Sequence, residues 1–270
     1  MAPIDRNSSR PAPSGAVVPL EAKGLVRTFG GLRAVDEMSI SLRRGEMLGV
    51  IGPNGAGKTT LFNLLAGSIR PSAGSVYAAG RDLTQAGAEA RIGAGVGRTF
   101  QIPRPFAQMT VLENVLTGAQ RQSGEQVWMN LLRPAKVAAE EHAAVEKARG
   151  LLQFVTLSAL EREPAQVLSG GQRKLLELAR VLMADPDVIL LDEPAAGVNP
   201  TLLELIVDRL LELNAAGKSI LLIEHNMDAV ARLCRRVVVM AAGRHLTEGT
   251  PSEVANDPAV IEAYLGGAVA

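Results

Sequence analysis

The sequence is short of cysteine, aromatic residues and net charge. Cys234 is the only cysteine among 270 residues, which excludes a disulfide within the chain and leaves no cluster with metal-ligand spacing. Lysine plus arginine and aspartate plus glutamate number 28 each, so the basic excess of proteins that bind many nucleic-acid phosphates is missing. These absences agree with a reducing cytosol and argue against nucleic acid as a partner.

Long apolar runs are missing as well. A membrane-spanning helix needs about 18 largely apolar residues, and no stretch without a charged residue exceeds about eleven. Residues 1–18 combine Asp5, Arg6 and Arg10 with several prolines and serines and contain no apolar segment, unlike a secretory signal. We therefore expect residues 1–18 to form a flexible tail, and we expect the chain not to cross a membrane by itself.

The glycine-rich stretch GPNGAGKTT, residues 52–60, carries the clearest chemical signal. It fits the phosphate-binding pattern G-x-x-x-x-G-K-[ST] and lies between a short apolar run, 47–51, and a helical pattern from Leu61. Glycines let backbone N–H groups wrap a polyphosphate, Lys58 adds charge for the terminal phosphates, and Thr59 offers a hydroxyl to Mg²⁺. The pattern predicts a nucleoside triphosphate site, with a plain glycine turn as the alternative. The predicted nucleotide-binding residues of this loop are Gly52, Pro53, Asn54, Gly55, Ala56, Gly57, Lys58, Thr59 and Thr60.

Two acidic residues end a predicted buried strand at VILLDE, residues 188–193. Ligands of α/β sheets gather at the carboxyl ends of strands, so we expect Asp192 to hold Mg²⁺ and Glu193 to orient or deprotonate an attacking water. General-base assistance of this kind contributes about 10²–10⁴-fold in rate, which favours hydrolysis over simple binding. The alternative is an acidic pair that only caps the next helix.

Two weaker signals lie elsewhere in the chain. Residues 168–172, LSGGQ, precede a helix expected over 173–183 and offer either a second anion site or merely a helix cap. Phe29 stands at the tip of an expected hairpin, in a chain with only 3% aromatic residues. An aromatic ring upstream of a phosphate loop can stack on adenine, although an ordinary turn-flanking aromatic is the competing explanation.

The remaining pattern predicts an α/β protein with a helical insertion. Strand-like residues 20–42, broken by two glycines, indicate an antiparallel hairpin, and residues 71–101 indicate further strands and turns. A capping box at Thr110 and Glu113 opens a helical block that continues around Trp128 and over 134–154. Strands and helices then alternate, as in a parallel sheet with crossover helices. Buried strands are expected at 188–191, 220–223 and 237–240, and helices at 175–183, 202–213, 228–233, from 250 onward and from 257 to 266.

Five motifs resemble those of ABC-type ATPases in order and spacing. They are GPNGAGKTT, RTFQ ending at Gln101, LSGGQ, VILLDEP and LLIEH ending at His225, within a similarity that runs from about 20 to 265. The resemblance implies an α/β fold: a P-loop ABC ATPase with a RecA-like mixed sheet core, an antiparallel β subdomain and an inserted α-helical subdomain at about 102–185. It implies an ATPase domain at 19–250 and a C-terminal helical tail at 251–270.

The resemblance also implies residue roles. Two such domains pair head to tail, so Ser169 and Gly171 of one copy are expected to meet the γ-phosphate that Lys58 of the other copy binds. The implied cofactors are ATP and Mg²⁺. The implied catalytic residues are Glu193, His225 and Gln101; the implied Mg²⁺ ligands are Thr59, Gln101 and Asp192; the implied further ATP contacts are Phe29, Ser169, Gly170, Gly171 and Gln172.

Three further motifs are similar to those of the ATP-binding subunits of branched-chain amino-acid importers and their relatives for urea or amides. They are AGVNP around Asn199, where the wider family commonly has aspartate, GVGRTFQ before 102, and VIEAYLG at 260–266. This likeness implies an energy-coupling subunit, peripheral at the cytoplasmic face of the inner membrane. Its implied partners are a second ATP-binding subunit, two transmembrane permease subunits that dock near Ile102, Arg104 and Phe106, and, indirectly, an extracytoplasmic solute-binding protein.

Two other functions are weighed against the importer. A soluble ABC-type ATPase of iron–sulfur cluster assembly would share the architecture, whereas repair-type members carry a long coiled-coil insertion and translation-type members two fused domains, which this sequence lacks. A small-molecule kinase would leave LSGGQ and His225 without a role. The sequence therefore favours the importer.

Overall fold

The computed structural model describes residues 18–99, 104–120, 122–123 and 133–266. The N-terminal tail to residue 17, Gln101 with Ile102, and the segment around Trp128 lie outside the described residues. The strands are β1 (Leu20–Phe29), β2 (Leu32–Leu42), β3 (Met47–Ile51), β4 (Ala73–Ala78), β5 (Arg81–Asp82), β6 (Val96–Arg98), β7 (Val188–Asp192), β8 (Ser219–Ile223), β9 (Arg236–Ala241) and β10 (Arg244–Gly249). The helices are α1 (Lys58–Leu65), α2 (Ala88–Gly93), α3 (Val111–Leu116), α5 (Pro134–Phe154), α6 (Gly170–Met183), α7 (Pro200–Ala215), α8 (Met227–Leu233), α9 (Pro251–Ala255) and α10 (Pro258–Gly266), with short 3-10 turns at Ser158–Leu160 and Ala165–Val167.

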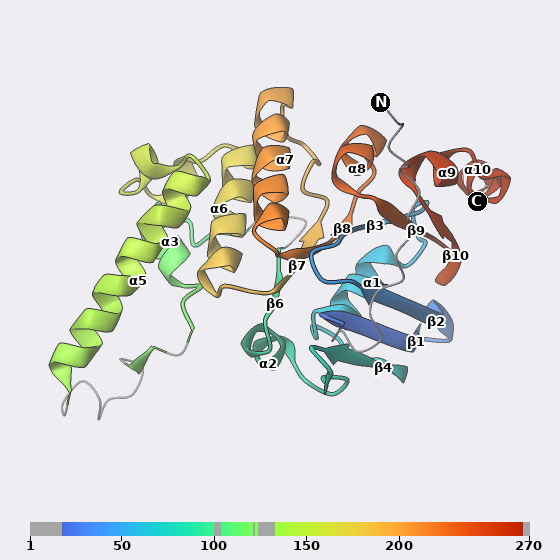
Figure 1. The fold of residues 1–270 in the computed structure, drawn as a ribbon, viewed down its shortest axis with the longest axis horizontal. Helices are drawn as coiled ribbons and strands as arrows, with labels where there is room; N and C mark the ends of the chain where they lie inside the picture. Colours follow the sequence, from blue (N-terminus) through green and yellow to red (C-terminus); the bar gives the residue numbers. More distant parts are fainter. Residues whose placement is uncertain (1–17, 100–103, 121, 124–132, 267–270) are drawn as a thin grey trace, which may run out of the picture.

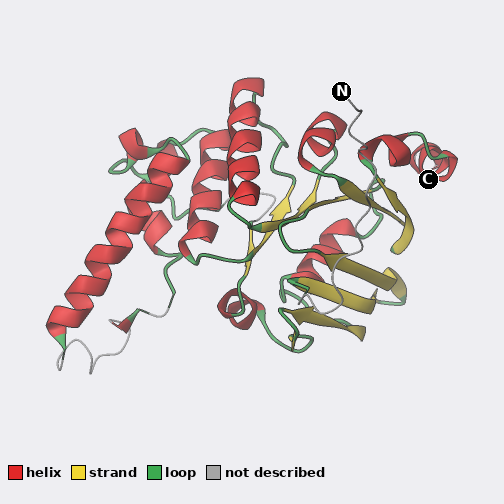
Figure 2. Cartoon of the chain, in the orientation of Figure 1, coloured by secondary structure: helices red, strands yellow, loops and turns green. Residues whose placement is uncertain are grey.

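Two sheets of different character carry the fold (Figures 1 and 2). The larger sheet has the order β10-β9-β3-β8-β7-β6, in which β10 pairs antiparallel with β9 and all other neighbours pair parallel. The smaller sheet, β2-β1-β4-β5, is antiparallel throughout. This is the mixed core sheet and antiparallel sheet that the ABC ATPase resemblance implies.

The larger sheet separates two apolar cores. Successive strand residues point to opposite faces, so Met47 and Ile51 of β3 join one core while Leu48 and Val50 join the other. The first core packs against α6, α7 and α8, and the second holds α1 between the two sheets (Figure 1). Every residue of β3, β7 and β8 is buried. Burial on both faces explains why these strands read as continuous apolar runs.

A group of helices stands at one end of the larger sheet (Figure 2). Helices α3, α5 and α6 pack against one another there. The predicted capping box is present at the start of α3, where the Glu113 backbone N–H donates to the Thr110 hydroxyl at 3.1 Å. In α5 only Val137, Ala148 and Leu152 are buried, so its charged residues form a solvated face. Within the described part of the chain, no helix is both long enough and apolar enough to span a membrane.

Helix α2 and its buried arginine were not anticipated by the sequence patterns. Arg91 is only 1% exposed, and its guanidinium donates to the carbonyls of Leu64 and Leu65, which end α1, and to that of Leu83 at 2.8 Å. Burial lowers the pKa of Arg91 to about 10, so it stays charged at neutral pH. A cation at the carboxyl end of α1 complements the helix dipole and satisfies terminal carbonyls. Arg91 thereby anchors the helix that begins at the phosphate loop.

Candidate functional site

The phosphate loop connects β3 to α1 in a conformation that requires glycine. Gly52 has a φ of +151°, and a Cβ there would lie 2.1 Å from the Met240 carbonyl oxygen. Gly57 has a φ of +95°, and its Cβ would lie 2.2 Å from the Ala34 carbonyl oxygen. The loop is thus pressed against the end of β9 and against β2. These two contacts explain why side chains are excluded at its first and third glycines.

Lys58 lies folded back on the loop. Its Nζ donates to the carbonyl of Gly52 at 2.7 Å and to that of Pro53 at 2.9 Å, and the residue is 7% exposed. Burial lowers the pKa of Lys58, while the carboxylates of Glu193 and Asp192 raise it. The first turn of α1 has no side-chain cap and no acidic residue. Its N–H groups and the Lys58 ammonium can therefore take an anion.

A cavity of about 460 Å³ opens over this loop. It gathers residues from the loop, from β2, from the ends of β7 and β8, and from the turn after β9. A cavity of this size falls in the range of small-molecule sites. Its lining residues are Leu32, Arg33, Ala34, Asn54, Gly55, Ala56, Gly57, Lys58, Thr59, Thr60, Glu193, His225, Ala242 and Gly243.

Glu193 and His225 meet at the wall of this cavity. The His225 Nε2 lies 3.1 Å from the Glu193 Oε1. Glu193 directly follows β7 and His225 follows β8 by two residues, so neighbouring parallel strands deliver both side chains to one edge of the sheet. A carboxylate held by an imidazole beside an anion-binding loop can orient and deprotonate a water molecule.

Asp192 lies behind this pair, at the last position of β7. Its side chain is 1% exposed, and its Oδ2 lies 3.2 Å from the Arg98 Nη2. Burial raises the pKa of Asp192, and Arg98 opposes the rise. The Asp192 Oδ1 is buried without a hydrogen-bond partner. An orphaned carboxylate oxygen, with the Thr59 hydroxyl on α1, fits a hard cation such as Mg²⁺.

The metal-ligand census of the described residues is consistent with that fit. Among them, no group of three or more His, Cys, Asp or Glu side chains could hold a metal ion alone. Mg²⁺ commonly binds through one or two protein oxygens together with substrate phosphates and water, and so needs no such cage. The donor set here therefore suits a cation that arrives with a nucleotide.

The LSGGQ residues lie away from the cavity. Ser169 caps α6: its hydroxyl accepts from the Gln172 N–H at 3.3 Å, and the Gln172 side chain accepts from the Ser169 N–H at 2.9 Å. Gly170 and Gly171 form the first turn of α6, so the helix begins three residues earlier than the sequence pattern predicts. None of these four residues lines the 460 Å³ cavity. In a single chain, the LSGGQ motif therefore does not reach the phosphate loop of that chain.

Phe29 also lies outside the cavity lining. It ends β1, is 45% exposed, and carries the Arg27 guanidinium 4.6 Å from its ring centre. Leu32, Arg33 and Ala34 of β2 line that side of the cavity instead, and no motif in the sequence marks them. Gln101, the other predicted member, lies outside the described residues.

Sequence patterns likewise miss two cations that contact the acidic residues. Arg98 reaches Asp192 across 94 positions, and Lys174 reaches the backbone at Glu193 across 19. Arg98 is the first residue of RTFQ, and Lys174 lies two positions after LSGGQ; these places in or near a recognised motif are the signal that could have singled them out.

Known proteins are similar to this chain in sequence and in fold. The ABC transporter family profile matches residues 35–196, and one described as "Branched-chain amino acid ATP-binding cassette transporter" matches 244–270. A probable branched-chain amino acid transport ATP-binding protein LivG of Archaeoglobus fulgidus is 41% identical over 92% of this chain and 95% of its own length. A high-affinity LivG of Salmonella typhimurium is 39% identical over 92% and 97%.

Solved structures agree. A nucleotide-free ATP-binding cassette from an ABC transporter superposes with a TM-score of 0.80 at 39% identity, covering 92% of this chain and 98% of that one. A second ATP-binding cassette, in its ADP conformation, gives a TM-score of 0.80 at 37% identity, covering 93% and 100%.

Proposed function

This chain belongs to the ABC transporter family of ATP-binding proteins, whose members hydrolyse ATP, and we propose that its hydrolysis drives import of branched-chain amino acids or related small polar solutes. One observation supports ATP hydrolysis most directly: Glu193 contacts His225 at the wall of the cavity that the phosphate loop also lines. The likeness to LivG proteins supports the choice of solute.

In the proposed reaction, ATP lies in the 460 Å³ cavity with its phosphates on residues 52–60. Lys58 leaves the carbonyls of Gly52 and Pro53 and turns its ammonium to the terminal phosphates. Glu193 takes the proton of the attacking water, and His225 holds the Glu193 carboxylate and contacts the γ-phosphate. Thr59, Asp192 and Gln101 would hold Mg²⁺, which neutralises phosphate charge when bound.

The second half of each ATP site comes from another ATP-binding subunit in this proposal. Ser169 is exposed at the amino end of α6, Gly171 is buried in the first turn of that helix, and neither lines the cavity of their own chain. A head-to-tail pair would bring the α6 dipole and the Ser169 hydroxyl of one subunit to the γ-phosphate of the other. Phe29 would then flank the adenine from outside the cavity lining.

Two permease subunits would couple this closure to transport. Phe106 is 52% exposed, and the Arg180 guanidinium lies 5.4 Å from its ring centre. A cavity of about 180 Å³, lined in part by Arg98, Thr117 and Arg180, lies beside it between β6, α3 and α6. We expect a cytoplasmic helix of the permease to dock here, which puts the chain at the cytoplasmic face of the membrane. A solute-binding protein would act indirectly, by delivering the solute.

Reconstitution tests this function. The chain is co-expressed with the permease and solute-binding subunits of a branched-chain amino-acid importer, purified from detergent-solubilised membranes and placed in vesicles with ATP on its own side. We expect co-purification with the permease and ATP-dependent uptake of labelled leucine, with urea and short amides as comparison solutes. A chain that hydrolyses ATP but never accompanies the permease would instead favour the iron–sulfur cluster assembly alternative.

A further inference from the structure

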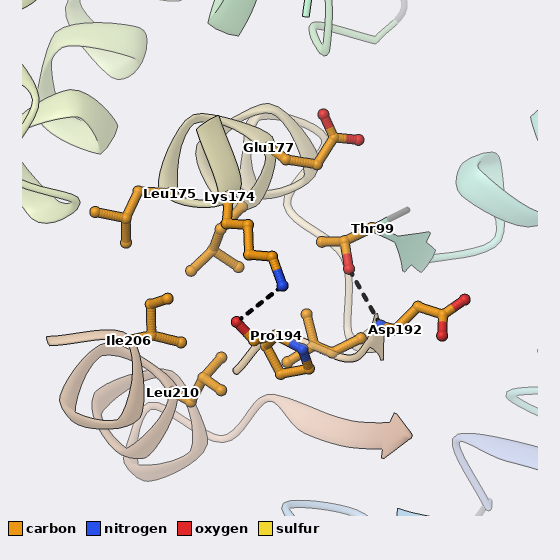
Figure 3. A pocket seen from close by; sticks show the side chains of 10 residues that line it. Thr99, Lys174, Leu175, Glu177, Asp192, Pro194, Ile206 and Leu210 are labelled. Atoms are coloured by element: carbon orange, nitrogen blue, oxygen red, sulfur yellow. Dashed lines mark hydrogen bonds between the residues drawn. The ribbon is translucent and has the colours of Figure 1, made fainter. Parts of the chain in front are cut away.

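Lys174 links α6, the helix that begins within LSGGQ, to the backbone of Glu193. It lies in α6 five residues after Ser169, and its Nζ donates to the carbonyl of Glu193 at 2.5 Å and to that of Pro194 at 3.3 Å. Figure 3 shows the side chain reaching from α6 to the loop that follows β7. The ammonium thus binds the main chain at the end of β7, where Asp192 and Glu193 lie.

Burial and the nearby carboxylates act in opposite directions on this ammonium. Burial lowers the pKa of Lys174, but the carboxylates of Glu224, Glu193 and Asp192 raise it. Lys174, Asp192, Thr99 and Pro194 line a small cavity of about 30 Å³, together with Ile206 and Leu210 of α7 (Figure 3). A cavity of that size holds about one or two water molecules at most. The two bonds that Lys174 makes are therefore partly shielded from bulk water.

The segment that Lys174 holds is strained. Glu193 adopts a φ of +49°, in the left-handed region that non-glycine residues rarely occupy and that persists only when the surroundings enforce it. Its N–H donates to the Ile223 carbonyl at 3.0 Å, and the next N–H along the chain, that of Ala195, donates to the Glu224 carboxylate at 2.6 Å. These bonds tie the segment to β8 and the residue after it. Lys174 ties it to α6 from the other side.

We propose that Lys174 is a positioning residue that couples the two ATP sites of the dimer. The inference rests on the proposed function, in which α6 of one subunit serves the partner's ATP while Glu193 of that same subunit serves its own. When the dimer closes and α6 moves towards the partner's γ-phosphate, Lys174 shifts the Glu193 backbone. This shift places the Glu193 carboxylate where it can activate water.

This link is separate from the helix cap at Asn199, further along the loop that follows Glu193. Asn199, which stands where the wider family commonly has aspartate, uses its side-chain oxygen to cap α7 by accepting from the Leu202 N–H at 2.9 Å. That capping bond lies within its own chain. Lys174, in contrast, contacts the catalytic residue directly from the helix that meets the partner.

The test compares Lys174→Met, Lys174→Gln and Lys174→Arg with a matched control, Lys147→Met. Lys147 makes the same kind of bond at the other end of α6, where its Nζ donates to the Met183 carbonyl at 3.0 Å. We expect Lys174→Met and Lys174→Gln to lower kcat about 10- to 100-fold, because small misplacements of a catalytic group have effects of this size. KM should change by less than about threefold, and the Hill coefficient for ATP should fall.

Lys174→Arg, which keeps the charge and the donors, should recover most of the rate, and Lys147→Met should behave as wild type. The effect of Lys174→Met should disappear in single-turnover assays of a Glu193→Gln background, because the two residues act through the same step. Unchanged kcat in both Lys174→Met and Lys174→Gln would overturn the proposal, and so would an equal loss in the Glu193→Gln background. A wild-type chain without ATPase activity would instead contradict the proposed function itself.

Discussion

Replacing Arg98 by methionine should destabilise the protein by leaving Asp192 buried without its cation. The two side chains are 10% and 1% exposed, and breaking a buried ion pair from one side costs about 3–5 kcal/mol. Arg98 Nη1 also donates to the Asn63 side chain of α1 at 2.6 Å, and that bond is lost too. We therefore expect a loss of about 4 kcal/mol in the free energy of unfolding at pH 7, measured by urea denaturation.

The sign of the pH dependence follows from the Asp192 carboxyl. Burial raises its folded-state pKa above the unfolded value even with Arg98 present. Without Arg98 the pKa rises further, so the variant gains protons on Asp192 that the wild type does not. The penalty should be fully present well above the folded pKa of the variant, and it should shrink as the pH falls through that pKa towards the lower folded pKa of the wild type.

Two controls isolate this effect. The double variant Arg98→Met with Asp192→Asn removes both charges and should recover part of the lost stability, because no unpaired charge stays buried. Arg232→Met breaks an exposed pair with Glu204, whose side chains are 43% and 58% exposed, and should leave stability unchanged. Equal stability of Arg98→Met and wild type at pH 7, or a penalty that does not shrink in acid, would refute the reasoning.

Two further changes address the fold around the site. Arg91→Met should lower the free energy of unfolding by about 3 kcal/mol, because it leaves the buried carbonyls of Leu64, Leu65 and Leu83 without donors. Urea denaturation measures this loss, and a loss smaller than about 0.5 kcal/mol would contradict the prediction. Cys234 is buried, which raises the pKa of its thiol to about 12, so iodoacetamide at pH 8 should label it only after denaturation. Labelling of the native protein at the denatured rate would show that α8 and β9 do not enclose the thiol.

The strands around the site follow from the sequence because they are buried on both faces. The expected strands at 188–191, 220–223 and 237–240 lie within β7, β8 and β9, since each is a continuous apolar run. The capping box at Thr110 is likewise confirmed, because it needs only two residues three positions apart. Features written into a few consecutive residues were therefore predictable.

Features that depend on neighbouring strands and helices were not. The contact between Glu193 and His225 requires β7 to lie beside β8, and no local pattern states that order. Helix α2 was missed because six residues with one large apolar side chain give no helical period, although its Arg91 anchors α1. Lys174 was passed over as a residue of the helix after LSGGQ, since its role depends on the main chain at Glu193.

The central claim is that each ATP is shared between Glu193 of one subunit and Ser169 of another. Molar mass by light scattering, with ATP and Mg²⁺ present, tests it on Glu193→Gln and on the same variant carrying Ser169→Asp. Aspartate still caps α6 but sets a carboxylate against the partner's γ-phosphate. We predict that Glu193→Gln binds ATP, hydrolyses it very slowly and persists as a dimer, whereas the double variant binds ATP as a monomer. Near-normal hydrolysis by Glu193→Gln, or an equally stable dimer with Ser169→Asp, would contradict the account.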